Sequence, residues 1–142
     1  MRLDLCGVRG STPAPGAEYV RTGGHTSCVA VSHDSAVAPT LVLDAGTGLQ
    51  RVSGLLDGSP FRGTILLTHL HWDHTHGLPF FGAADRPDAA TTLVMPDQGE
   101  DPGSVLDRVL SPPHSPIGPR VWAASGPSPA SSRDATASRG ST

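Results

Sequence analysis

Short apolar runs alternate with polar, Gly-containing and Pro-containing segments along most of the chain. Runs of roughly four to eight residues with such boundaries are typical of β-strands. We expect strands at residues 3–8, 27–32, 40–44, 63–68 and 91–95. The third run is almost entirely apolar, which predicts burial on both faces. A short polar turn joins the second run to the third, and this spacing predicts a hairpin.

Two segments carry helical patterns. Residues 49–56 form a short amphipathic stretch that is followed by Gly58 and Pro60. A second helix is expected to begin at Asp101, an N-cap residue followed by proline, and to run to about Leu110. Several strands with a few short helices predict an α/β fold of the α+β type.

Composition limits the protein to one domain with a thin core. The chain has 142 residues, 37% of them hydrophobic and only 4% aromatic, with 17 Gly and 14 Pro. A net charge of −3 implies no general attraction to nucleic acid. Neither a signal peptide nor a membrane-spanning run is visible, so we expect a cytoplasmic protein that does not associate with membranes. Cys6 and Cys28 lie in strand-like runs and are expected as buried free thiols.

The C-terminal segment has a different composition. From Ala123 onward it contains no Val, Leu, Ile, Met or aromatic residue. Such a segment cannot bury enough apolar surface to offset the entropy lost on ordering. The expected organisation is therefore a domain over residues 1–120 and a disordered low-complexity tail over residues 121–142.

The candidate chemistry follows the fourth apolar run. Four of the seven histidines and one aspartate fall between residues 69 and 76. Imidazole nitrogens and carboxylate oxygens are ligands for Zn²⁺. Alternate side chains of an extended segment point the same way, so His69 and His71 can hold one ion. Asp73 and His74 follow the strand and can reach an adjacent ion, which predicts a two-metal site.

Simpler interpretations of these polar residues stay open. In the simplest one, residues 69–76 form a polar loop that happens to be rich in histidine. His76 is expected to be solvated or to support the ligands, His114 is expected to be a loop histidine, and His33 is expected in solvent. Asp44 ends the third strand, and one role for its side chain is to cap the following helix.

The motif His-x-His-x-Asp-His at residues 69–74 resembles the signature of the metallo-β-lactamase superfamily. Further segments resemble the branch of ribonuclease Z and the phosphodiesterase-like members: 7–13, 23–28, 43–48 and 77–81. The resemblance covers roughly residues 1–120. It implies that the chain forms the first half of an αββα sandwich.

The same resemblance implies roles for individual residues. His69 and His71 would hold one metal, and Asp73 and His74 would hold the second. Asp73 would also act in catalysis by orienting the attacking water. Asp44 and Thr68 would lie behind the ligands and support them by hydrogen bonds. The expected cofactor is a pair of Zn²⁺ ions, with Mn²⁺ or Fe²⁺ as open alternatives.

The activity implied is hydrolysis of a phosphodiester or related ester through a metal-bound hydroxide. The substrate would be a small molecule or a nucleotide or RNA phosphoester. A redox relative with a di-iron site is less compatible, because such relatives tend to carry Glu where His71 stands.

The later ligands of the superfamily have no counterpart here. After His76 the chain has one further histidine, His114, and no apolar strand that ends in His or Asp. We therefore expect a truncated or frame-shifted coding sequence and little turnover by this chain alone. The alternative function is a non-catalytic metal-binding remnant, or a half-domain that needs a complementing chain. An uncovered sheet face is then expected, and it favours aggregation, a homo-oligomer or a second chain.

Overall fold

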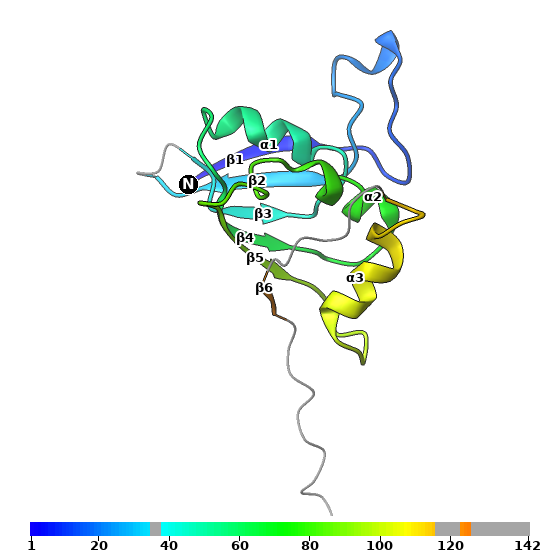
Figure 1. The fold of residues 1–142 in the computed structure, drawn as a ribbon. Helices are drawn as coiled ribbons and strands as arrows, with labels where there is room; N and C mark the ends of the chain where they lie inside the picture. The colour runs from blue at the N-terminus through cyan, green and yellow to red at the C-terminus, as the bar shows by residue number, and fades with distance from the viewer. Residues whose placement is uncertain (35–37, 116–122, 126–142) are drawn as a thin grey trace, which may run out of the picture.

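A computed structural model describes residues 1–34, 38–115 and 123–125. Its centre is one mixed sheet whose six strands lie side by side in chain order (Figure 1). The strands are β1 Arg2–Gly7, β2 Cys28–Ser32, β3 Leu41–Leu43, β4 Arg62–Leu66, β5 Ala90–Val94 and β6 Ala123–Ser125. The first three strands pair antiparallel, whereas β3 to β6 pair parallel. The parallel half requires crossover connections, and these carry the helices.

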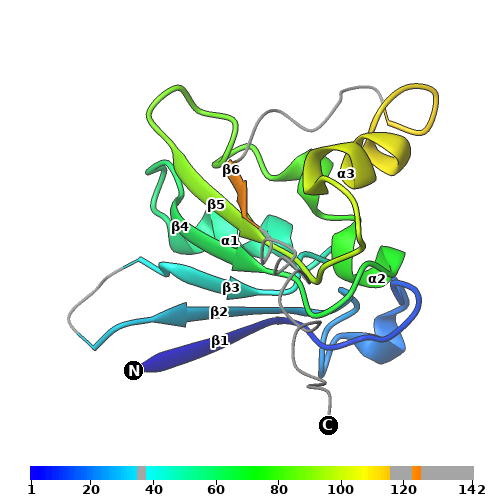
Figure 2. The ribbon, with the colours of Figure 1, turned by 90° about the horizontal axis from the view of Figure 1, so that it is seen from below.

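The helices are short. They are α1 Leu49–Leu55, α2 Trp72–Thr75 and α3 Pro102–Leu110, with 3-10 turns η1 Ala17–Tyr19 and η2 Leu78–Phe80. Helix α1 covers one face of the sheet and lies behind β3 and β4 in Figure 2. Asp101 caps α3, because its side chain accepts a hydrogen bond from the backbone N–H of Ser104 at 2.9 Å. No helix in the described part of the chain is long and apolar enough to cross a bilayer.

One core cluster joins the sheet to the buried sides of α1 and α3. Alternate strand residues point toward α1 and are buried, among them Ala30, Val42, Ile65 and Leu93. The rings of Phe61 and Phe81 meet beside them with centroids 5.4 Å apart. Since only three phenylalanines and few other large side chains are available, this single layer uses most of the bulky apolar residues.

The opposite face of the sheet is also apolar but is not fully covered. The strand register aligns one residue from each of five strands across this face: Leu5, Val29, Leu43, Leu66 and Val94. Leu5 is 66% exposed and Leu66 is 36% exposed. The remaining three are half-buried. Part of this row, called the uncovered face below, is therefore accessible in the described part of the chain.

Most predicted elements are confirmed. The five strands and both helices form within a few residues of the expected bounds, the hairpin between β2 and β3 is present, and the α+β class holds. His33 and Asp34 are exposed in the hairpin turn. Cys6 and Cys28 are free and buried, and a hydrogen bond from Cys28 lowers the pKa of Cys6 to about 7.

Several details differ from the prediction. Residues 72–75 form helix α2 rather than a loop. Of the two aromatic residues after this helix, Phe81 is buried but Phe80 is exposed. In β3 only Val42 is fully buried, since Leu41 and Leu43 face the uncovered side.

The C-terminal prediction is also changed in part. Ala123–Ser125 were expected to be disordered, yet they pair with β5 as a short strand. Strand pairing uses backbone groups only, so the absence of large side chains does not prevent it. The predicted domain boundary near residue 120 and the rest of the predicted tail lie outside the described residues.

Candidate metal centre

The candidate site lies where the parallel strands β3 and β4 end. Leu43 pairs with Leu66 in the register of these strands, so Asp44 and the segment after Leu66 meet at one edge of the sheet. The backbone N–H of Asp44 donates to the carbonyl oxygen of Leu66 at 2.8 Å. This edge is a common position for functional groups in sheets with parallel strands.

Asp44 supports the segment that carries the histidines. Its Oδ1 accepts hydrogen bonds from the backbone N–H and the hydroxyl of Thr68, both at 2.8 Å. The Ser27 hydroxyl donates to Oδ2 at 3.3 Å. Asp44 has a φ of 60°, a left-handed conformation that Asp tolerates better than most residues. The carboxylate thus connects β3 to the start of the motif.

Burial is the largest single effect on the pKa of Asp44 and raises it. The hydrogen bonds from Thr68 and the nearby ring of His74 lower the pKa, and together they outweigh burial. The net pKa lies below the usual value of 3.8. Asp44 is therefore a buried carboxylate that stays ionised at neutral pH. A fixed negative charge here stabilises cationic or metal-bound groups beside it.

His69 and His71 point ring nitrogens at each other. Nε2 of His69 lies 3.2 Å from Nδ1 of His71. Two nitrogens that bind one tetrahedral zinc at 2.0–2.1 Å are separated by about 3.3 Å. The Thr68 hydroxyl lies 3.1 Å from Nδ1 of His69, the ring nitrogen that faces away from His71. This contact orients the ring, as supporting groups do for metal-binding histidines.

Asp73 and His74 form a second pair on α2. Nε2 of His74 lies 3.4 Å from Oδ2 of Asp73. The same oxygen accepts a hydrogen bond from the backbone N–H of Ser11 at 2.7 Å, and this bond is the main cause that lowers the pKa of Asp73. Ser11 has a φ of 62° and lies in the loop after β1, so that loop reaches the motif.

The other nitrogen of His74 faces Asp44. Nδ1 lies 2.9 Å from Oδ2 of Asp44, an ion-pair distance when the ring is protonated. The direction of the ring N–H does not meet hydrogen-bond geometry, and Nδ1 is otherwise buried without a partner. Asp44 therefore supports the His74 pair as well as the segment that carries the His69 pair.

The two pairs are adjacent. The ring centroids of His69 and His74 are 3.9 Å apart. Within residues 1–34, 38–115 and 123–125, no three His, Cys, Asp or Glu side chains are arranged to hold one ion. The structure thus brings together all four predicted ligands as two pairs, and the two predicted supporting residues, Asp44 and Thr68, contact them.

Glycines allow this close packing. A Cβ on Gly46 would lie 2.1 Å from the carbonyl oxygen of Asp73, and a Cβ on Gly77 would lie 2.1 Å from that of Gly46. The backbone N–H of Ala45 donates to the carbonyl oxygen of His74 at 2.8 Å, and that of Gly77 donates to Ala45 at 2.8 Å. The turn after β3 therefore packs against α2 and is hydrogen-bonded to its C-terminal part.

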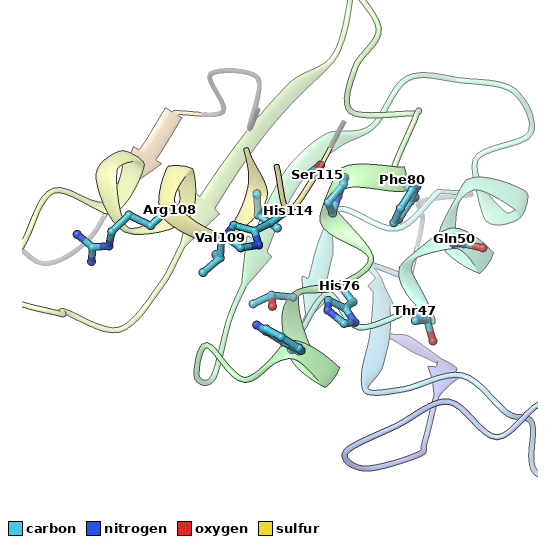
Figure 3. A pocket seen from close by; sticks show the side chains of 12 residues that line it. Thr47, Gln50, His76, Phe80, Arg108, Val109, His114 and Ser115 are labelled. Carbon is cyan, nitrogen blue, oxygen red and sulfur yellow. The ribbon is translucent and has the colours of Figure 1, made fainter. Parts of the chain in front are cut away.

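Ser11 and Ser27 also contact the site, although no motif in the sequence marks them. Both are small polar residues in Gly-rich segments, and only the order of strands in the sheet brings them to Asp73 and Asp44. The described structure also contains a groove of about 480 Å³ that borders α2 and that no sequence motif indicates. His76 and His114 both line this groove (Figure 3).

Comparison with protein-family models, curated proteins and solved structures finds no match.

Proposed function

We propose that this chain is a metal-dependent hydrolase that binds zinc at residues 69–74 and acts on a phosphodiester or related ester. The observation that carries the proposal is the spacing of the two side-chain pairs. Their donor atoms are 3.2 Å and 3.4 Å apart, close to the edge of a tetrahedral zinc site.

The surroundings of the pairs support the same function. His69 and His71 would hold one ion, and Asp73 and His74 would hold the other. The ionised Asp44 adds negative charge and fixes the ring of His74. A zinc pair would supply Lewis-acid activation of water and of the ester oxygen.

Asp73 is the candidate catalytic residue among the chain's own groups. Its carboxylate is held by the N–H of Ser11, and its lowered pKa keeps it ionised. An ionised carboxylate at this position can accept a hydrogen bond from a water molecule and orient it for attack. The preference for a phosphodiester rests on the resemblance of the surrounding segments to ribonuclease Z and phosphodiesterase-like proteins.

A second function is favoured by the number of ligands. Catalytic zinc normally has three protein ligands, whereas each pair here supplies two. A non-catalytic metal-binding protein, or a half-domain completed by another chain, fits two ligands per ion. The sheet face that contains Leu5 and Leu66 offers a surface for such a second chain.

Zinc content per chain tests metal binding. The wild type, the variant His69→Ala/His71→Ala and the matched control His33→Ala/His114→Ala are equilibrated with zinc, desalted and analysed for bound metal. We expect zinc in the wild type and the control and a clear loss in the motif variant. Equal zinc in all three proteins would contradict the proposed site.

Hydrolysis of bis(p-nitrophenyl) phosphate by the zinc-loaded protein separates the two functions. Under the hydrolase proposal, slow turnover is expected that disappears in His71→Ala and in Asp73→Asn. Bound zinc without turnover would leave the non-catalytic alternative.

A further inference from the structure

Helix α2 has a second face that the metal site does not use. Trp72, Thr75 and His76 are spaced i, i+3 and i+4, so they share one side of the helix. Asp73 and His74 project from the other side. The first side forms a wall of the groove that borders α2, and the opposite walls come from η2 and α3 (Figure 3).

The groove presents aromatic rings to solvent. Trp72 is 67% exposed and Phe80 is 61% exposed, in a chain with few aromatic residues. The Trp72 ring stacks on His76 with centroids 5.3 Å apart and an angle of 26° between the rings. This contact orients the indole and leaves most of it accessible. The volume of the groove, about 480 Å³, is within the usual range for small-molecule sites, about 300–1,000 Å³.

The described walls of the groove offer no permanent charge that is free of an ion pair. Among the lining residues in the described part of the chain, Arg108 is the one permanently charged side chain. Its guanidinium already donates to both carboxylate oxygens of Glu100, at 2.6 Å and 3.1 Å. The other polar side chains among these lining residues can hydrogen-bond to a ligand: Thr47, Gln50, Trp72, Thr75, His76, His114 and Ser115.

We propose that this groove binds an uncharged planar heteroaromatic ring, such as a nucleobase. The faces of the ring would stack on Trp72 and Phe80, and its polar edge would hydrogen-bond to Gln50, His76 or His114. Aromatic stacking tolerates any flat ring, whereas the polar side chains favour a ring with donors and acceptors. The proposal requires no metal and does not depend on the proposed hydrolase function.

The test is a titration of ¹⁵N-labelled protein with adenosine, followed at the indole N–H resonance of Trp72. Comparison with Trp72→Phe assigns that resonance, because the chain has a second tryptophan. We expect a saturable shift with adenosine and none with ribose or inorganic phosphate. Phe80→Ala should weaken binding about tenfold, and the surface control Val20→Ala should leave it unchanged.

Three results would overturn the proposal. One is the absence of an adenosine-dependent shift at Trp72, and another is the same affinity in Phe80→Ala as in the wild type. The third is a Trp72 shift that depends on protein concentration alone, since it would assign the groove to contacts between copies of the chain. The variant His69→Ala/His71→Ala should bind adenosine normally, so failure of the metal site would not be mistaken for failure of the groove.

Discussion

The carboxylate of Asp44 accepts two hydrogen bonds from Thr68, one from the backbone N–H and one from the hydroxyl, each at 2.8 Å. These residues end two neighbouring parallel strands and are 24 positions apart in the chain. The same carboxylate lies 2.9 Å from the ring of His74. One buried side chain therefore connects both halves of the candidate metal centre to the sheet.

Replacing this carboxylate should destabilise the fold. Asp44→Asn keeps the shape and tolerates the positive φ but removes the charge, so we expect the free energy of unfolding to fall by about 1–3 kcal/mol. Urea denaturation measures the change. Asp57→Asn is the matched control, because Asp57 also has a positive φ, of 47°, but is exposed. Equal losses in the two variants would show that the Asp44 hydrogen bonds contribute little.

The contribution of Asp44 should depend on pH. Its pKa in the folded protein lies below the usual 3.8, so the unfolded chain binds the proton more readily. The stabilisation is therefore present above the unfolded pKa and is lost as pH falls through the folded pKa. The difference in unfolding free energy between wild type and Asp44→Asn should therefore be present at about pH 5 and above and shrink below about pH 4. Urea curves at several pH values measure it, and a difference that grows on acidification would contradict this sign.

Gly46 should not tolerate a side chain. An added Cβ would meet the carbonyl oxygen of Asp73 at 2.1 Å and the Thr26 hydroxyl at 2.4 Å. We expect Gly46→Ala to lower the free energy of unfolding by about 1–3 kcal/mol or more and to reduce zinc binding by displacing α2.

The matched control for that substitution is Gly54→Ala. Gly54 lies in α1, is exposed, and has nothing within 4 Å of the added Cβ. The higher helix propensity of alanine should raise the free energy of unfolding by about 0.5–1 kcal/mol. If Gly46→Ala raised the free energy of unfolding as this control does, the close approach of Gly46 to the carbonyl oxygen of Asp73 would be wrong.

The uncovered sheet face should promote self-association. Its aligned Leu and Val side chains form a continuous apolar strip that water solvates poorly. Sedimentation velocity over a range of concentrations should show association in the wild type and less in Leu5→Lys. Val20→Lys adds the same charge to an exposed residue of the loop after η1 and should not reduce association. A monomer at all concentrations would contradict the prediction.

Local elements and candidate ligands could be predicted from the amino-acid sequence alone. Runs of apolar residues predicted β1 to β5, the Asp-Pro pair predicted the start of α3, and the His-x-His-x-Asp-His motif identified His69, His71, Asp73 and His74. These features depend on interactions within a few residues, such as alternation along a strand, capping of a helix and spacing of ligands.

The tertiary structure alone decided which distant residues support the site and where ligands other than metal can bind. Ser11 reaches Asp73 across 62 positions, and the groove combines α2, η2 and α3. The exposure of Phe80 and the partial burial of β3 likewise depend on which elements cover each face. Strand order and register set these contacts, and no local pattern in the chain encodes them, because register is fixed by the balance of packing over the whole sheet.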